Sequence, residues 1–253
     1  MAAPDGTASE ECAQCHRQIY DSYARTPMAQ SSGPVGGGLI QEKFDQAVFE
    51  HAPTGFRYRV FRNREGYFVE FAKPDGALRG AKGLAYFVGS GATARSYLLA
   101  DEGYLFEAPA AYYSGGRKWN LAPAYDTYAY PYLTRPVMPA CLTCHASFLT
   151  ATPGTQNRYG SPPFGEGGVA CERCHGPGEQ HIRNMRAGNS THDAAILNPA
   201  KLAPDLRDSV CSQCHLTGEV RVMKPGHDWQ SFQVGQRLSD SLTVFVRPGR
   251  LLA

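Results

Sequence analysis

The residues most able to do chemistry in this sequence are its eight cysteines, which all fall in four copies of the pattern Cys-x-x-Cys-His. On one helical turn, thiols at positions i and i+3 and an imidazole at i+4 share a face. That face can offer two sulfurs to the vinyl groups of a porphyrin and one imidazole nitrogen to its iron. The pattern is the signature of c-type haem attachment, so the sequence predicts four covalently bound c-type haems.

We number these copies in chain order as motif one (residues 12–16), motif two (141–145), motif three (171–175) and motif four (211–215). The eight thiols expected to form thioether bonds to haem are Cys12, Cys15, Cys141, Cys144, Cys171, Cys174, Cys211 and Cys214. The proximal iron ligands expected from the same motifs are His16, His145, His175 and His215.

Two other interpretations of the paired cysteines, zinc binding and disulfide bonding, have less support. Four Cys-x-x-Cys pairs could form two zinc sites of four thiolates each, but zinc requires no histidine directly after the second cysteine. Redox disulfides also use this spacing, yet four such bridges, each followed by histidine, would be hard to explain. The histidine that follows every pair therefore favours haem.

Four further histidines could supply the distal iron ligands: His51, His181, His192 and His227. Their number equals that of the motifs, which favours iron held by two histidines. His181 follows His175 by six residues that include two glycines. Such a short chain should not pass round the porphyrin to the opposite face of the same iron, so His181 is expected to serve a different haem. Met28 is the substitute candidate if one of these histidines is not a ligand.

The composition predicts a mostly irregular chain with short α-helices around four c-type haems and a small inserted antiparallel β-subdomain, an α+β multihaem cytochrome. Hydrophobic residues make up 42% of the chain, with 27 glycines and 18 prolines, so the haems should replace part of the core. We divide the chain into a first haem helix with a linker (1–38), a β-rich insertion (39–113) and a domain for haems two to four with an extended tail (114–253).

Periodicity and turn residues predict helices at 8–25, 138–150, 169–188 and 207–217, with Ser9 as an N-cap of the first. Strands are expected at 56–61, 67–71, 84–88, 96–100 and 104–107, with turns at 63–66 and 73–76. Residues 31–38 have the composition of a flexible linker. Residues 112–137 are too rich in proline for a long helix, and their tyrosines could shield haem faces.

The four motifs, the run Cys-His-Gly-Pro-Gly-Glu-Gln-His at 174–181 and the stretch 210–219 resemble the periplasmic tetrahaem cytochrome c family. Its best-known member accepts electrons from hydroxylamine oxidoreductase. The resemblance covers mainly residues 8–30 and 110–250 and is specific for haem, not for a substrate. It implies closely stacked haems with mostly two histidine ligands, and in that family one haem can lack a distal ligand. The β-rich stretch departs from the family's compact helical pattern.

The expected function is electron transfer rather than catalysis, because haem would consume every thiol and no catalytic serine, carboxylate pair or phosphate loop stands out. One alternative is an oxidoreductase acting on a nitrogen or sulfur oxyanion at one five-coordinate haem, with Arg183, His192 or a tyrosine of 112–132 as helper. Another is a filament or larger complex in which haems of successive subunits stack.

The expected partners are redox proteins outside the cytoplasm, in the periplasm or beyond the cell, because haem is attached to thiols there. Residues 1–5 lack the basic and apolar regions of a signal peptide, so we expect one to be missing from this sequence. No run approaches the ~18 apolar residues of a membrane span. The net charge of +2 and the absence of a basic run give no indication of nucleic-acid binding.

Overall fold

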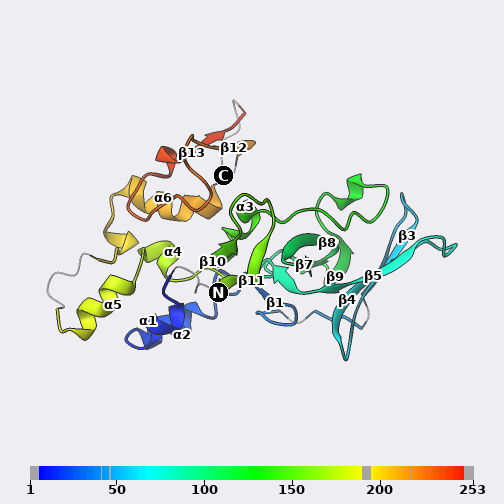
Figure 1. The fold of residues 1–253 in the computed structure, drawn as a ribbon, viewed down its shortest axis with the longest axis horizontal. Coiled ribbons are helices and arrows are strands. Elements are labelled where there is room, and N and C mark those ends of the chain that lie inside the picture. Colours follow the sequence, from blue (N-terminus) through cyan, green and yellow to red (C-terminus); the bar gives the residue numbers. More distant parts are fainter. Residues whose placement is uncertain (1–5, 41, 46, 190–194, 217, 248–253) are drawn as a thin grey trace. The chain divides into compact units, whose positions relative to one another are not determined.

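The computed structural model describes residues 6–40, 42–45, 47–189, 195–216 and 218–247. The chain forms two compact units, which we call the central unit (residues 21–169) and the terminal unit (residues 1–20 and 170–253). Figure 1 shows that the described sheets β1 to β11 belong to the central unit, while α4, α5 and α6 belong to the terminal unit. The two units are defined by which residues contact one another in the fold. The division into three segments that the sequence suggested stays a prediction.

Antiparallel strands build the central unit, in two large sheets and one hairpin. The five-stranded sheet has the order β1-β6-β7-β8-β9: β1 (Ser32–Pro34), β6 (Tyr86–Val88), β7 (Ala94–Asp101), β8 (Tyr104–Tyr113) and β9 (Lys118–Leu121). The four-stranded sheet has the order β2-β3-β4-β5: β2 (Ala47–His51), β3 (Phe56–Asn63), β4 (Gly66–Ala72) and β5 (Arg79–Leu84). The hairpin pairs β10 (Ala146–Ala151) with β11 (Tyr159–Gly167).

Alternation of apolar and polar residues explains the strands that the sequence predicted. Along β3, Phe56, Tyr58 and Val60 are buried, while the arginines between them are exposed. Val60 pairs with Val69 of β4, and residues of both large sheets join one aromatic-rich core. The predicted turn at 63–66 is confirmed, because the Asn63 side-chain oxygen accepts hydrogen bonds from two backbone N–H groups that follow it.

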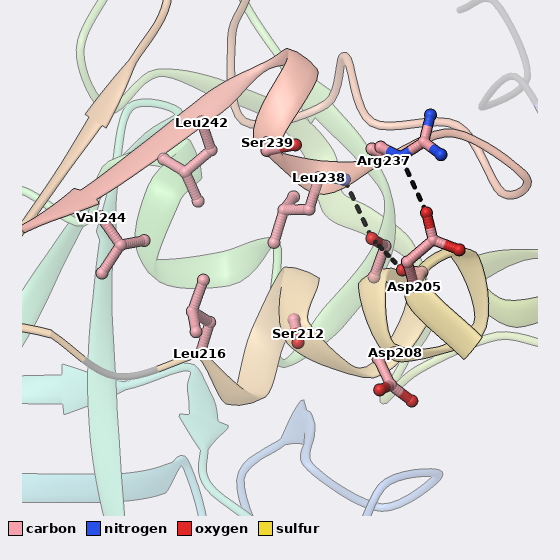
Figure 2. Close-up of a pocket in the computed structure, with 10 residues that line it drawn as sticks. Asp205, Asp208, Ser212, Leu216, Arg237, Leu238, Ser239, Leu242 and Val244 are labelled. Carbon is pink, nitrogen blue, oxygen red and sulfur yellow. Dashed lines mark hydrogen bonds and ion pairs between the residues drawn. The ribbon is translucent and has the colours of Figure 1, made fainter. Parts of the chain in front are cut away.

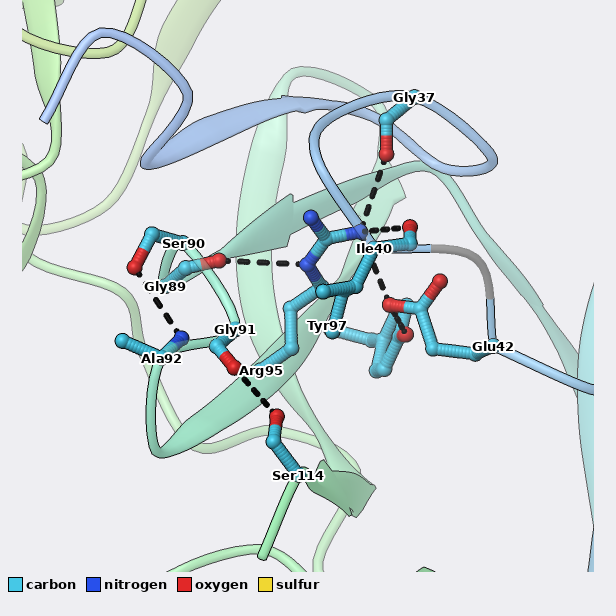
Figure 3. Close-up of polar contacts among 10 residues, drawn as sticks. All are labelled: Gly37, Ile40, Glu42, Gly89, Ser90, Gly91, Ala92, Arg95, Tyr97 and Ser114. Carbon is cyan, nitrogen blue, oxygen red and sulfur yellow. Dashed lines mark hydrogen bonds and ion pairs between the residues drawn. The ribbon is translucent and has the colours of Figure 1, made fainter. Parts of the chain in front are cut away.

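A buried ion pair fastens the segment before β2 to the five-stranded sheet (Figure 3). The Arg95 guanidinium lies 2.9 Å from the Glu42 carboxylate, and both side chains are almost fully buried. Arg95 also donates to the backbone carbonyls of Gly37, Ile40 and Gly89. A Cβ at position 38, where the glycine φ is +85°, would lie 2.5 Å from the guanidinium. The expected flexible linker at 31–38 is therefore wrong: this segment contains β1 and wraps a buried arginine.

A second, smaller core of the central unit supports motif two. The short helix α3 (Pro139–Leu142) begins motif two. Leu142 is fully buried against side chains of the five-stranded sheet and of the β10–β11 hairpin. The chain then turns into β10, so the predicted helix at 138–150 is wrong after its first turn. Ala146 joins the same core, which makes a strand more favourable than a continued helix.

The terminal unit contains short helices and one small hairpin. Its helices are α1 (Ser9–Ala13), α4 (Glu172–His175), α5 (Glu179–Arg186), α6 (Pro204–His215) and the start of α2 (Arg17–Tyr23), with 3₁₀ turns η2 (Pro199–Lys201) and η3 (Leu238–Asp240). The hairpin pairs β12 (Val220–Met223) with β13 (Leu242–Phe245). A further 3₁₀ turn, η1 (Tyr125–Thr127), lies in the central unit.

The sequence prediction overestimated helix and irregular chain and underestimated strands. The expected helix at 8–25 breaks between α1 and α2, and Ser9 does not cap it. Instead the Ser9 hydroxyl accepts a hydrogen bond from the backbone N–H of Cys171. The strands β1, β2, β5, β9, β10, β11 and β12 were not predicted. Every helix in the described part of the chain is too short or too polar to cross a lipid bilayer.

Candidate haem sites

Each Cys-x-x-Cys-His motif folds as one turn of helix. In motif one the N–H of His16 donates to the carbonyl of Cys12 at 2.8 Å, and in motif three His175 donates to Cys171 at 3.0 Å. Motif four occupies the last turn of α6. In motif two the turn is tighter, since His145 donates to Leu142. The local backbone therefore gives each motif the compact turn that its spacing predicts.

The structure gives no support to the zinc and disulfide alternatives. All eight cysteines are thiols. Among the described residues, no three His, Cys, Asp or Glu side chains converge in the way that a metal ion needs. Burial raises the pKa of the Cys141 and Cys174 thiols, which opposes the thiolate form that a nucleophile requires.

Within the terminal unit, the fold brings His16 of motif one together with His181 of α5. Their ring centres lie 6.3 Å apart and their planes differ by 14°. A metal-bound imidazole nitrogen lies about 2 Å from the metal and roughly 1 Å from its own ring centre, so two imidazoles on opposite sides of one metal have centres about 6 Å apart. The observed separation and the nearly parallel planes fit that arrangement.

His175 of motif three is held by a backbone carbonyl. Its Nδ1 lies 2.8 Å from the carbonyl oxygen of Leu197, and the N–H of Leu197 donates in return to the carbonyl of His175. Because a carbonyl oxygen only accepts, Nδ1 carries the hydrogen, and Nε2 of the neutral ring keeps its lone pair for a metal. The sequence analysis missed Leu197, since a main-chain contact leaves no signature in the side chains.

His145 of motif two has a different environment. Its Nδ1 is buried without a hydrogen-bond partner, and burial lowers the pKa of this imidazole. The Ser31 hydroxyl lies 2.9 Å from the carbonyl oxygens of both His145 and Met28. The backbone of Met28 is therefore close to motif two, and its side chain is 46% exposed. Ser31 was also missed, because its role depends on a fold that joins distant segments.

Two of the remaining predicted distal ligands, His51 and His227, lie within the described residues. His51 ends β2 in the four-stranded sheet, where its Nδ1 lies 2.9 Å from the Thr54 hydroxyl. This sheet belongs to the larger core, whereas motif two rests on the smaller one. His227 lies exposed in a turn of the terminal unit. His192 lies outside the described residues.

The donor set of the motifs fits a c-type haem. Two thiols and an imidazole share each turn, the lone pair of His175 is directed by Leu197, and the His16 and His181 rings have the spacing of a trans pair. Exposed apolar side chains also lie near these residues: Ile19 follows His16, Met138 precedes Cys141 and Met185 follows His181. A large apolar plate would cover such side chains.

A pocket of about 330 Å³ lies on a different face of α6 from the cysteines of motif four (Figure 2). Its α6 residues follow a helical stripe that includes Asp205, Ser209 and Ser212, whereas Cys211 and Cys214 lie on another side of the helix. At the edge of the pocket, Nε of Arg237 lies 2.8 Å from Oδ2 of Asp205. The pocket is therefore not the expected contact surface of the fourth haem.

Comparisons with known proteins point to the same class. The family described as cytochrome c554 and c-prime matches residues 127–176, which include motifs two and three. The match covers about a fifth of the chain. It supports a c-type cytochrome with c-type haem as its cofactor.

The fold is similar to the crystal structure of the outer cell wall cytochrome OcwA, with a TM-score of 0.58 and 18% sequence identity. The likeness covers 94% of this chain and 44% of that one, so the chain spans less than half the length of OcwA. Among curated proteins, none matches this sequence. The number of haems, their ligands and the link to the hydroxylamine oxidoreductase group stay predictions.

Proposed function

We propose that this protein is a multihaem c-type cytochrome that carries single electrons between redox partner proteins outside the cytoplasm. The observation that supports it most is the pair formed by His16 and His181, 165 residues apart in sequence (181 − 16), with the ring separation of two ligands on one iron.

In this proposal the eight motif cysteines hold four haems through thioether bonds, and each motif histidine binds the iron of its own haem. When bound, each haem supplies a centre that alternates between ferric and ferrous iron. His16 and His181 would together hold the iron of the haem at motif one. The Leu197 carbonyl orients His175 and makes its Nε2 a stronger donor.

The distal iron ligand of the haem expected at motif two has two candidates. Met28, the substitute candidate, is supported by Ser31, whose hydroxyl lies 2.9 Å from the carbonyl oxygens of both Met28 and His145. His51 is the candidate from the histidine count. We propose His192 and His227 as ligands within the terminal unit only from that count. As an alternative assembly for the same function, subunits would stack into a filament and pass electrons along their haems.

The test is a His181→Ala variant of the full holoprotein, with Gln180→Ala on the same helix as the matched control. His181→Ala should turn one haem from low-spin to high-spin, seen by electron paramagnetic resonance, while haem mass stays unchanged. The affected haem should be the one that disappears from a Cys12→Ser/Cys15→Ser variant. Spectra of His181→Ala that equal those of the control would refute the assignment.

A second candidate function is reduction or oxidation of a small nitrogen or sulfur oxyanion at the haem of motif two. It is favoured because His51 ends a strand of the sheet that packs on the larger core, whereas motif two packs on the smaller one. Cyanide or nitric oxide should then bind one haem of the wild-type protein, and Met28→Ala should leave that binding unchanged. Low-spin spectra of all four haems, without ligand binding, would exclude this function.

A further inference from the structure

Glu107 is a carboxylate that the central unit holds in its interior. It lies in β8 with 17% of its side chain exposed, and its Oε2 lies 2.9 Å from Nη1 of Arg135. Burial raises the pKa of Glu107 above its usual value, although Arg135 and a hydrogen bond from Ser96 act in the opposite direction. The carboxyl therefore binds a proton more readily than an exposed glutamate does.

The backbone connects this carboxylate to motif two. The N–H of Glu107 donates to the carbonyl of Arg135, and the N–H of Val137 donates to Leu105, so residues 105–107 and 135–137 run side by side. Helix α3 starts two residues after Val137 and carries Cys141. The charges of Glu107 and Arg135 both act on the Cys141 thiol. A charge change at the haem expected on Cys141 would act on Glu107 in turn.

The groups that face Glu107 come from several elements: Ser96, Tyr113, Tyr125, Arg135 and Cys141, with Asp126 beside Tyr113. Burial raises the pKa of both tyrosines, so their phenols keep their protons at neutral pH. Arg135 remains a cation, and thioether formation would remove the proton of Cys141 permanently. Asp126 interacts with Tyr113. Among the described groups that interact with Glu107, the phenols, the guanidinium and the sulfur in a thioether thus keep a fixed charge, which leaves the Glu107 carboxyl as the group that can exchange a proton.

We propose that Glu107 takes up one proton when an electron reaches the haem of motif two and releases it when the electron leaves. The step would balance as one electron supplied by a redox partner to the expected haem and one solvated proton taken from bulk solvent by the Glu107 carboxylate, and both would leave again when the electron is passed on. The proposal rests on the proposed haem at motif two. It makes this site a coupling point between electron transfer and proton binding, with Arg135 setting the pH at which coupling occurs.

The test is a redox titration of the full holoprotein at several pH values, followed by haem absorbance. The midpoint potential of the motif-two haem should fall as pH rises, by up to about 59 mV per pH unit, which is a tenfold change in equilibrium for one electron. That haem is identified by its loss in a Cys141→Ser/Cys144→Ser variant. Glu107→Gln should flatten the dependence, while Arg135→Gln should move it to higher pH because the opposing cation is gone.

The matched control is Glu70→Gln, which removes a carboxylate that also pairs with an arginine but lies in the four-stranded sheet. It should keep the wild-type pH dependence. If Glu107→Gln binds all its haems and retains the wild-type slope, the proton coupling is wrong and the electron-transfer function stands. If mass spectrometry finds no haem on the wild-type protein from a host able to attach it, the proposed function itself fails.

Discussion

The two units of this protein differ sharply in what fills their interiors. Among the described residues, the central unit buries twenty-five hydrophobic residues, including the aromatic cluster between its sheets. The terminal unit buries five, and two of them are alanines: Ala13, Ala170, Val210, Leu238 and Leu242. Yet the terminal unit carries three of the four motifs. The unit that carries most of the motifs is thus the unit with the smaller hydrophobic core among the described residues.

This contrast indicates that haem has a different structural role in each unit. Burial of apolar surface is the main favourable term in folding, and five small or aliphatic side chains supply little of it. The terminal unit would therefore depend on its three haems for an interior. The central unit has a core of hydrophobic side chains, so its fold would not depend on the single haem expected at motif two.

The largest expected effect comes from removing a haem from each unit in turn. Cys171→Ser/Cys174→Ser should leave the terminal unit with little protection against amide hydrogen exchange. Cys141→Ser/Cys144→Ser should leave the strands of the central unit protected, because hydrophobic side chains fill the core between its two large sheets. Hydrogen exchange followed by mass spectrometry measures both. Equal loss of protection in the two variants would contradict the difference between the units.

A smaller effect tests how much the central unit depends on its own interior. Glu42→Ala leaves the buried Arg95 without its carboxylate and should lower the free energy of unfolding by about 3–5 kcal/mol. The control is Glu70→Ala, whose partner Arg59 is exposed, with an expected loss of about 1 kcal/mol or less. Urea unfolding is followed by the fluorescence of Trp119, which belongs to the core of this unit, in a Trp229→Phe background that removes the tryptophan of the terminal unit. A cost for Glu42→Ala no larger than the control would show that the ion pair is not structural.

The haems themselves should reflect the contrast through their potentials. His175 donates a hydrogen bond to Leu197, which makes it a stronger iron donor, whereas Nδ1 of His145 has no such partner. A stronger donor stabilises ferric iron, so the haem of motif three should have a lower midpoint potential than that of motif two, by tens of millivolts. Potentiometric titration of wild-type protein and of the two cysteine variants assigns each potential. A higher midpoint potential for the haem of motif three than for that of motif two would contradict this prediction.

The smallest expected effect concerns alkaline pH and the aromatic core. Burial raises the pKa of Tyr58 from 10.0 to about 12. Between these values the folded protein binds more protons than the unfolded chain, so stability falls as pH rises from about 10 to 12. Tyr58→Phe should reduce the steepness of this fall in pH-dependent urea unfolding. An unchanged slope would mean that Tyr58 ionises as easily in the folded protein as in the unfolded chain.

Local patterns predicted the parts of the fold that local forces determine. The motifs, the strands β3 and β4 and the turn at Asn63 follow from spacing, alternation and side-chain capping. The hairpin after motif two was missed because burial of Ala146 against distant strands outweighs the helical turn before it. The glycine-rich segment 31–38 was taken for a linker, since its order depends on Arg95, which lies far along the chain.

The candidate site divides in the same way. The cysteines and histidines of the motifs were found from their types and spacing alone. The partner of His16 could be named only as a class, because which histidine lies opposite depends on how α5 folds back within its unit. Leu197 and Ser31 contribute through contacts that follow from the fold alone. Glu107 has no motif, and its character comes from burial in β8.

The pairing of His16 with a residue 165 positions later also has a consequence for how the protein is assembled. Because a chain is made from its N-terminus, motif one is made before the segment that carries His181. The pair of His16 and His181 can therefore form only after the residues between them have been made, motifs two and three among them. The ligand pair of motif one would then be completed later than its thioether bonds could form.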